Sequence, residues 1–594
     1  MSKPCFFPLL TALALTLPSS AFPQNPVPRN PVPCPDAVGT SVASPKELRS
    51  RNGRLQVSLW LRNSHDSTGQ MQYCYVDEHG DRSPTLRLRP GDLLVLKLKN
   101  ELKNELSLPS SAPHPHRAAP SGCPSAVMTT DTTNLHFHGL NLSPSCHSDD
   151  FLHTSIPPFS KAFVYRVRIP NNQPPGLYWY HPHPHGHSEE QVLGGASGAL
   201  IVEGIGAANP LVAGLPERVL VIRDQKLERD QKPGSSARAT SDRDPSRPAK
   251  DLSINFIPVP YPEYPVPDIK TRPLTRELWR VLNASADTYV NLGVLFNGEW
   301  QKSGLAAVHG SWQLLGLVAL DGVPISEANS SAAKVLWKTE ILIPPGGRAE
   351  FVFQTPPEGI KAELLTAGAD TNPPEDEDND IPAATASGSS IPGTTPDTIP
   401  DNDDNTPPRP LARIVSSSSA VEPPYLTEAA PPANLRPIAP LATVSPVRQR
   451  KLYFSAKVMD PKHPDTSTVF YITEEGHIPK AFDPSVLAPD IVVHQGDVED
   501  WTIENRSQES HAFHIHQLHF LLLERDGEPA GENYLLDTVD VPYWDGRSTQ
   551  FPSVKLRMDF RNPDIVGTFP YHCHILQHVD GGMMGLIQVR PKPL

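Results

Sequence analysis

The sequence lacks the features that mark several classes of protein. Its formal net charge is −14, and no basic patch with interleaved aromatic residues appears along its 594 residues. Nucleic acid is therefore not an expected partner. After residues 1–21 no apolar run is long enough for a transmembrane helix, so we expect no membrane span. Methionine is scarce too, with seven residues, and Met583-Met584 is the one place where two lie together.

Residues 1–21 are typical of an export signal. Lys3 provides a weakly positive start, and the apolar run at 6–17 is too short to span a membrane. The small residues Ser-Ser-Ala at 19–21 suit a cleavage site, and there is no twin-arginine pair. We therefore expect a periplasmic or secreted protein.

Cysteine is rare, with six residues, and their positions suit that compartment. Cys5 would leave with the signal. An even set follows before residue 150: Cys34, Cys74, Cys123 and Cys146. Such a set predicts two disulfides in an oxidising space. Three pairings are possible, and we favour Cys34–Cys74 with Cys123–Cys146.

Strand patterns dominate over helix patterns. The chain has 69 prolines and 37 glycines, and its apolar runs are short. In TLRLRPGDLLVLKLKN (85–100), Leu94 and Leu96 should face one side and Lys97 and Lys99 the other, which is the period of a half-buried strand. Short strands separated by Pro and Gly predict an all-β fold of sandwiches, and the length suits three or four domains.

Three motifs recur in the same order near the two ends of the chain. RPGDLLVLKLKN (89–100) recurs as HQGDVEDWTIEN (494–505), NLHFHGL (134–140) as HAFHIHQL (511–518), and GLYWYHPH (176–183) as GTFPYHCH (567–574). This repetition indicates two copies of one domain, which we place at 45–206 and 448–594.

The region between the copies has no histidine pairs but retains strand-like runs. We expect a metal-free middle domain of the same architecture at 210–416. Residues 370–408 form an acidic insertion rich in Pro, Thr and Ser, a composition that predicts disorder. We expect 409–414 to be a strand and 417–447 to be a linker.

Four His-x-His pairs are the strongest functional signal: His136/His138, His181/His183, His514/His516 and His572/His574. In a strand, residues i and i+2 point to the same face, so each pair should present two imidazoles side by side. A single pair is more often a surface or core feature. Two pairs at matching places in each copy instead predict a shared metal site, and eight imidazoles suit a cluster of three copper or zinc ions.

The stretch YHCHILQHVDGGMM (571–584) adds sulfur to the histidines. Because Cys573 lies between two paired histidines, its sulfur should point to the opposite face of their strand. The other donors of this set are His511, His578 and Met583. Two imidazoles, a thiolate and a weak thioether are typical of a blue-copper electron-transfer site. The first copy has Pro182 in place of Cys573, so it can share the cluster but cannot hold a blue copper of its own.

The segments HFHG, YHPHPHG, HAFHIH and HCHILQHVDGGMM resemble, in this order, the signature motifs of multicopper oxidases, the family of laccases, bilirubin oxidases and cuprous oxidases. The resemblance spans roughly 45–594. It implies three cupredoxin-like Greek-key β-sandwich domains and four copper ions, one of type 1, one of type 2 and two of type 3. The three-ion cluster would lie between the first and third domains.

The resemblance also implies a ligand set, motif by motif. Type 2 copper would be held by His136 and His514, one type 3 ion by His138, His181 and His574, and the other by His183, His516 and His572. Type 1 copper would be held by His511, Cys573, His578 and Met583. The histidines His185, His187 and His519 match no ligand position, and we expect them around the site or at the surface.

The implied activity transfers single electrons from a small-molecule reductant to type 1 copper and reduces dioxygen to water at the cluster. The protein is expected to be a monomer. Scarce methionine favours a laccase-like oxidase of phenols or aromatic amines over a cuprous or other metal-ion oxidase. A non-catalytic copper-binding assembly protein is a further alternative. A copper nitrite reductase is disfavoured, because it needs no second full set of His-x-His pairs.

Dioxygen reduction consumes protons, and here the sequence departs from its relatives. Many relatives carry a carboxylate directly after the last type 1 histidine, where this chain has Val579. Two catalytic candidates remain, Asp149 after the first His-x-His pair and Asp580 after Val579. We favour Asp149 as the residue that relays protons. The alternative is that Asp149 and Asp150 form a solvated turn.

Overall fold

The computed structural model describes residues 34, 40–67, 69–103, 123, 128–227, 247–298, 310–326, 333–373, 406–426, 440–460, 467–531 and 534–592. The expected export signal lies outside these residues, as does 374–405, which is most of the expected insertion. Within the described ranges, no helix has both the length and the apolar character needed to cross a membrane.

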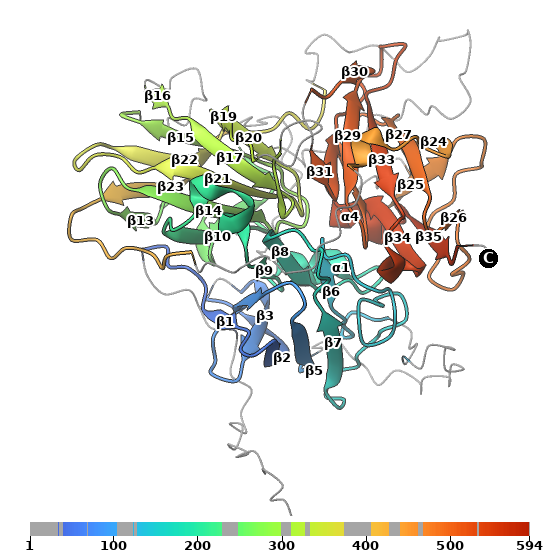
Figure 1. Cartoon of the computed structure of the whole chain (residues 1–594), viewed down its shortest axis with the longest axis horizontal. Helices are drawn as coiled ribbons and strands as arrows, with labels where there is room; N and C mark the ends of the chain where they lie inside the picture. Colours follow the sequence, from blue (N-terminus) through green and yellow to red (C-terminus); the bar gives the residue numbers. More distant parts are fainter. Residues whose placement is uncertain are drawn as a thin grey trace, which may run out of the picture.

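The described residues form six β-sheets, and these pair face to face into three sandwiches along the chain. Figure 1 shows the first sandwich in blue and teal, the middle one in green and yellow, and the third in orange and red. The expected all-β fold of cupredoxin-like sandwiches is confirmed.

The first sandwich packs the sheet β3-β2-β5-β7 against the sheet β1-β4-β9-β8-β6. Its strands are β1 (Glu47–Arg49), β2 (Arg54–His65), β3 (Met71–Asp77), β4 (Thr85–Leu88), β5 (Leu93–Asn100), β6 (His136–His138), β7 (Phe163–Arg168), β8 (Gly176–His181) and β9 (Gly198–Val202). Strand β5 confirms the sequence pattern, because Leu94 and Leu96 are buried in the core and Lys97 is exposed.

The middle sandwich packs the sheet β12-β11-β10-β14-β21-β17-β18, with β19 beside β17, against β13-β23-β22-β15-β16, with β20 beside β15. Its strands are β10 (Glu217–Gln225), β11 (Asp251–Ile254), β12 (Ile257–Val259), β13 (Asp268–Thr271), β14 (Arg276–Asn283), β15 (Val290–Phe296), β16 (Ser311–Trp312), β17 (Leu315–Leu320), β18 (Val323–Pro324), β19 (Leu336–Lys338), β20 (Glu340–Ile343), β21 (Arg348–Gln354), β22 (Ala362–Thr366) and β23 (Arg409–Ser416). The strand expected at 409–414 is β23.

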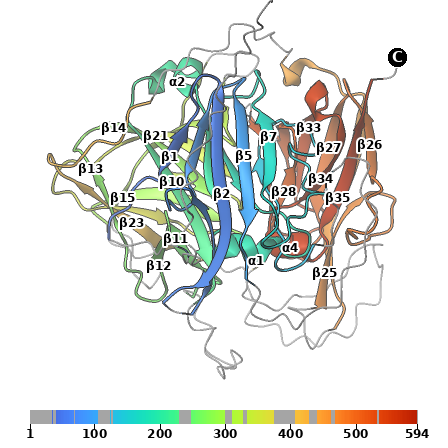
Figure 2. The same ribbon diagram turned by 90° about the horizontal axis from the view of Figure 1, so that it is seen from below.

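The third sandwich packs the sheet β25-β24-β27-β33-β29-β30, with β31 beside β29, against β26-β35-β34-β28-β32. Its strands are β24 (Arg448–Val458), β25 (Thr468–Glu474), β26 (Ile491–His494), β27 (Val498–Asn505), β28 (His511–Ile515), β29 (Phe520–Arg525), β30 (Glu528–Pro529), β31 (Leu535–Leu536), β32 (Thr538–Val541), β33 (Ser553–Asp559), β34 (Gly567–Cys573) and β35 (Met584–Arg590). The short helices are α1 (Ser188–Leu193), α2 (Ile205–Ala208), α4 (Leu576–Asp580), η1 (Pro210–Val212), η4 (Leu441–Thr443) and η5 (Pro563–Ile565). Figure 2 shows α1 and α4 side by side, where the first and third sandwiches meet.

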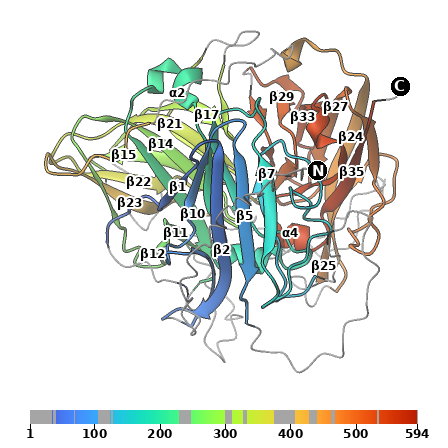
Figure 3. The ribbon, with the colours of Figure 1, turned by 60° about the horizontal axis from the view of Figure 1, so that its bottom comes forward.

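One strand order recurs in all three sandwiches. The order β3-β2-β5-β7 of the first matches β11-β10-β14-β21 of the middle and β25-β24-β27-β33 of the third. In each case the two central strands are parallel and the outer pairs are antiparallel. Figure 3 shows β2, β5 and β7 of the first sandwich running between the other two. The middle sandwich therefore repeats the architecture without repeating the histidines.

An asparagine at the end of the second central strand explains part of the sequence repeat. Asn100, Asn283 and Asn505 are fully buried at the ends of β5, β14 and β27. Each side-chain amide donates to two or more backbone carbonyls of neighbouring loops or strand ends, among them Ile156, Ile343 and Val541. Buried carbonyls need such donors, so the repeated Asn ties the loops together at the same end of each sandwich.

Buried ion pairs join the first and middle sandwiches. Arg87 on β4 pairs with Glu217 on β10, and Glu217 also accepts a hydrogen bond from Arg280 Nε at 2.8 Å. Arg280 in turn pairs with Glu350 on β21, whose Oε1 accepts from the backbone N of Leu177 at 2.8 Å. Because these charges are buried, removing one of them would leave its partners with less compensating charge.

The two favoured disulfides are present. Cys34 and Cys74 have a Cα–Cα distance of 5.8 Å, and Cys123 and Cys146 one of 5.5 Å. Cys573 is free and buried. The Cys123–Cys146 loop encloses β6, which carries the first histidine pair.

We predict that the Cys123→Ser/Cys146→Ser variant is less stable than the wild type by about 3 kcal/mol, because the cross-link restricts the unfolded chain. Denaturant unfolding measures the difference, and peptide mapping without reductant tests the bridge itself. Free thiols at both positions in wild-type protein purified without reductant would contradict the pairing.

Candidate metal centre

The four His-x-His pairs converge between the first and third sandwiches. Ring centroids within a pair lie 5.6 Å apart for His136/His138 and 5.0 Å apart for His514/His516, so the imidazoles stand side by side as expected. Only the first pair lies wholly within a strand. In the other three, the second histidine follows the end of β8, β28 or β34. The pairs therefore sit at strand ends, where loops leave room for a site.

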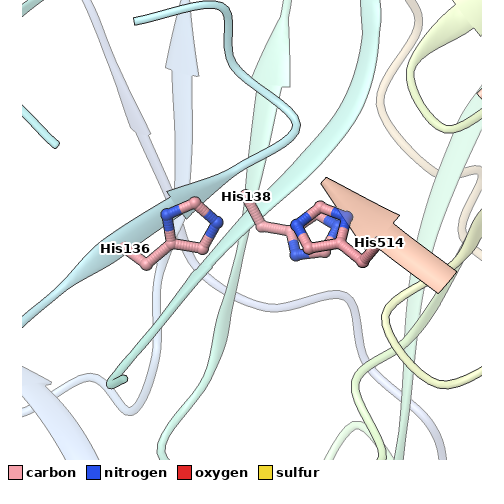
Figure 4. Close-up of side chains that lie close together, drawn as sticks. All are labelled: His136, His138 and His514. Atoms are coloured by element: carbon pink, nitrogen blue, oxygen red, sulfur yellow. The ribbon is translucent and has the colours of Figure 1, made fainter. Parts of the chain in front are cut away.

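The eight histidines form three groups whose ring nitrogens lie within 4.8 Å of one another. The groups are His136/His138/His514, His138/His181/His574 and His183/His516/His572. Figure 4 shows the rings of His138 and His514 overlapping, and their centroids are 4.0 Å apart at an interplanar angle of 13°. Two rings of the third group point at His572 Nε2, which lies 3.1 Å from His516 Nε2 and 3.4 Å from His183 Nε2.

Most of these rings are fixed through one nitrogen. Two rings donate to carboxylates: His136 Nδ1 to Asp149 and His138 Nε2 to Asp537, each at 3.0 Å. Three donate to backbone carbonyls: His181 Nδ1 to Pro182 (2.9 Å), His514 Nδ1 to Asp537 (2.7 Å) and His572 Nδ1 to Cys573 (2.7 Å). An acceptor at one nitrogen places the proton there and leaves the lone pair on the other nitrogen.

The remaining nitrogens suit a metal. Among the described residues, no hydrogen-bond partner reaches His136 Nε2, His138 Nδ1, His181 Nε2, His514 Nε2, His516 Nδ1 or either nitrogen of His574. An unpaired polar atom in a dry interior costs free energy, and so many at one place need a common partner. A ligated metal ion is such a partner, and the donor set suits copper.

Burial favours the neutral form of seven of these eight imidazoles, because it lowers their pKa. Loss of solvation lowers the pKa of His514 well below its usual value, and the neighbouring rings His572, His574 and His136 lower it further. Burial likewise lowers the pKa of His572 to about 4. Neutral imidazole is the form that binds metals, so the rings are ready to ligate at neutral pH.

A second site lies on the other face of β34. Cys573 Sγ is 3.6 Å from Nδ1 of both His511 and His578, and the two Nδ1 atoms are 3.1 Å apart. The outer nitrogens are held by Ser507 Oγ on His511 Nε2 and by Glu509 Oε1 on His578 Nε2, each at 2.7 Å. The expected reversal of faces between Cys573 and its neighbours is therefore present.

Two further residues enclose this sulfur site. Met583 is fully buried, and its carbonyl accepts a hydrogen bond from the backbone N of Cys573 at 3.3 Å. Phe470 stacks on the His578 ring with centroids 4.2 Å apart. Only 1% of His578 is exposed, so the site excludes bulk water.

Asp149, the favoured proton carrier, lies directly against the cluster. Besides His136 Nδ1, its carboxylate accepts from the backbone N of Phe137 at 2.9 Å and from Gln517 Nε2 of the third sandwich. It is 1% exposed. The alternative of a solvated turn is therefore wrong for Asp149, which also holds a ring in place.

Asp580 lies farther from the cluster. Its carboxylate accepts from the backbone N of Ser188 at 3.2 Å and of Glu189 at 2.9 Å, at the start of α1. Burial raises the pKa of Asp580 to about 7. Ser188 Oγ is 3.5 Å from His183 Nδ1, so among the described contacts Ser188 links Asp580 to His183.

The three unassigned histidines surround the site without joining its groups. His519 is buried and contacts Asn141 Oδ1 at 3.2 Å and the Asp321 carbonyl at 3.1 Å. His185 is buried against Phe151 and Phe482, and burial lowers its pKa to about 4. His187 precedes α1 and is only half-buried.

Sequence reasoning missed Asp537 and Glu509, which hold rings, and Gln517, which binds Asp149. The repeat contained one usable signal. Asp149 follows His136 by 13 residues and bonds its ring, and Asp537 follows His514 by 23 residues and bonds that ring with its carbonyl. Each copy thus supplies an aspartate after its first pair, although the loops differ in length.

The fold is thus a set of β-sandwiches with buried groups of histidines that could hold metal ions. Comparison with known proteins finds matches for two segments of the chain. Residues 127–206 and 458–593 each match a family model described as multicopper oxidase. Both segments that carry the four His-x-His pairs therefore match multicopper oxidases.

Curated relatives align over short segments. A multicopper oxidase of Staphylococcus aureus is 35% identical over 114 residues, which is 18% of this chain and 23% of that protein. A laccase of Haloferax volcanii is 34% identical over 94 residues, 15% of each chain. The alignments thus span under a quarter of these relatives.

Solved structures share the whole fold at low identity. A multicopper oxidase from Campylobacter jejuni, described as a metallo-oxidase, has a TM-score of 0.59 at 22% identity and covers 94% of this chain and 97% of its own. The McoA multicopper oxidase of Aquifex aeolicus has a TM-score of 0.57 at 18% identity, covering 93% and 100%. This likeness establishes the fold.

Proposed function

We propose that the protein is a four-copper oxidase that couples one-electron oxidation of phenols or aromatic amines to the reduction of dioxygen to water. The observation that carries the proposal is the set of buried, neutral imidazoles whose free nitrogens converge in three groups, with a cysteine–histidine site one residue away on the same strand. Copper bound at the sulfur site would accept single electrons, and copper at the three-ion site would reduce dioxygen.

The proposed ligands are those implied by the motifs. His136 and His514 would hold type 2 copper; His138, His181 and His574 one type 3 ion; His183, His516 and His572 the other; and His511, Cys573, His578 and Met583 type 1 copper. His138 also lies in the group of His136 and His514, so it stands between two of the proposed ions.

The backbone of β34 would carry electrons between the two sites. Cys573 is bonded directly to His572 and His574, whose rings belong to two different groups of the cluster. The Cys573 carbonyl also accepts from His572 Nδ1 at 2.7 Å. The covalent path from the Cys573 sulfur to either histidine group therefore crosses a single peptide bond, to His572 or to His574. All three residues are buried.

The position of Glu509, next to His578, bears on which class of reductant the protein could oxidise. His578 is almost fully covered, so a reductant cannot rest on its ring edge, and the Glu509 carboxylate occupies Nε2. Glu509 is itself only 6% exposed, so a substrate would meet its carboxylate at a small exposed area, where it could accept a hydrogen bond from a phenol hydroxyl or an aromatic amine. It can equally bind a metal cation, which keeps a cuprous or other metal-ion oxidase as the second candidate. The likeness to the Campylobacter jejuni metallo-oxidase supports that candidate, and the scarcity of methionine opposes it.

A non-catalytic copper-binding role is the third candidate, and the completeness of the donor set opposes it. We further propose that the protein is exported and acts as a monomer on a small-molecule reductant and dioxygen. The two disulfides support export, because they need an oxidising compartment.

Copper content and colour test the proposal. Purified, copper-loaded protein should hold about four coppers per chain and be intensely blue from thiolate-to-copper charge transfer. Cys573→Ser should lose the blue band while the three-ion site still fills. Metal analysis and visible spectra measure both, and a fully loaded but colourless wild type would contradict the type 1 assignment.

Oxygen uptake separates the substrates. We expect the wild type to consume dioxygen with a panel of phenols faster than with Cu(I). Glu509→Gln keeps an acceptor oxygen but loses the charge, so it should reduce Cu(I) oxidation more than phenol oxidation. Uptake with Cu(I) alone would favour the metal-ion oxidase instead.

Asp149→Asn should slow dioxygen reduction by about 10-fold or more, because general acid–base groups contribute at least that much. Type 1 copper should still be reduced at the wild-type rate in a stopped-flow experiment. Asp580→Asn is the matched variant, because its carboxylate is buried near the cluster without touching a ring. Normal turnover in Asp149→Asn with slow turnover in Asp580→Asn would place the proton route through Ser188.

A further inference from the structure

The middle sandwich holds none of the proposed ligands, yet one of its side chains enters the site. Arg348, at the start of β21, is 1% exposed and contacts all three sandwiches. Its Nη1 donates to Asp537 Oδ1 at 2.7 Å in the third sandwich, and Nη2 binds the other carboxylate oxygen. Its Nε donates to the Leu177 carbonyl of the first sandwich at 3.2 Å.

The middle sandwich also fixes the guanidinium from behind. Arg348 Nη2 donates to the Asp321 carbonyl at 2.9 Å, and its Nη1 donates to the Gly346 carbonyl at 3.1 Å. The Asp321 carboxylate meanwhile accepts from the backbone N atoms of Asp537 and Thr538, at 3.2 and 3.1 Å. The planar guanidinium of Arg348 is thus bonded to Asp537 on one side and to the carbonyls of Asp321 and Gly346 on the other. Lysine cannot reproduce this geometry.

Asp537 passes this constraint on to two rings. Its Oδ1 accepts from His138 Nε2 at 3.0 Å, and its carbonyl accepts from His514 Nδ1 at 2.7 Å. These bonds leave His138 Nδ1 and His514 Nε2 free, the atoms that belong to the metal groups. A carboxylate that rotated would release His138 and allow its proton to move to the ligating nitrogen.

From this chain of contacts we infer that Arg348 is a positioning residue for the three-ion site. It acts through Asp537 to hold His138 in the ligating tautomer and orientation. The cluster is then incomplete without the middle sandwich, although that sandwich ligates no metal. This inference rests on the proposed copper function.

Arg280 provides a matched control. It too is a fully buried arginine of the middle sandwich, paired with Glu217 and Glu350. Through Glu350 it reaches the backbone N of Leu177, the same residue whose carbonyl Arg348 contacts. None of the hydrogen bonds described for Arg280 reaches Asp537 or a histidine, so Arg280→Lys weakens the same interface without touching the rings.

The experiment compares copper-loaded wild type, Arg348→Lys and Arg280→Lys in competition with a copper chelator. Type 2 copper is counted by electron paramagnetic resonance and type 1 copper by the blue band. Arg348→Lys should hold cluster copper at least about 10-fold more weakly and keep the blue band, the size expected for loss of a partner behind a metal ligand. Arg280→Lys should lower the melting temperature and leave the ratio of cluster to type 1 copper unchanged.

Cluster copper held as tightly in Arg348→Lys as in Arg280→Lys would overturn the inference. If Arg348→Lys does not fold, Asp537→Asn takes its place, because it keeps an acceptor oxygen for His138 but removes the charge that binds the guanidinium. Wild-type cluster copper in Asp537→Asn would also overturn it. A wild type that binds copper only at the sulfur site, or not at all, would instead contradict the proposed function.

Discussion

The structure depends on keeping a cluster of imidazoles buried, able to bind metal and correctly oriented between the first and third sandwiches. Each buried ring has two nitrogens, and a metal can use only one of them. The protein satisfies the other with a carboxylate or a backbone carbonyl, as at His136, His138 and His514. This arrangement fixes the tautomer, and burial lowers the pKa of His138 and His514, which favours their neutral form. Both histidine-bearing sandwiches must dock before any complete group exists.

Strand geometry explains why two different sites can lie so close together. Successive side chains of β34 point to opposite faces, so Cys573 enters the core of the third sandwich while His572 and His574 enter the interface. One residue of backbone therefore separates a sulfur site from a site made only of imidazole. In the first copy, Pro182 stands at the corresponding position, and the strand serves one site instead of two.

Much of this arrangement could be predicted from the sequence, because it follows from period and repetition. The alternation in β5, the unpaired Cys573 and the four histidine pairs are local patterns, and their duplication indicated that the copies meet. Apart from Asp149, the residues that hold the rings could not be predicted in this way. Asp537, Glu509 and Arg348 act across loops or across domains, at separations that no strand period encodes. Their carboxylates and guanidinium resemble any surface charge until the fold buries them.

The two copies carry different residues directly after a His-x-His pair. The contacts where the three sandwiches meet give a physical reason for the difference. Gly139 follows His138, and Gln517 follows His516, and both have positive φ, +84° and +62°. A Cβ at Gly139 would lie 2.5 Å from Arg348 Nη2 and 2.6 Å from Asp537 Oδ2, so no side chain fits.

Gln517 faces the first sandwich instead, and its side chain has room to bind Asp149. A non-glycine residue in this region costs backbone energy, on the order of 1 kcal/mol, and the bond to a buried carboxylate offsets it. Arg348 of the middle sandwich and Asp537 thus leave no room for a side chain at position 139, whereas Gln517 has the Asp149 carboxylate as its partner.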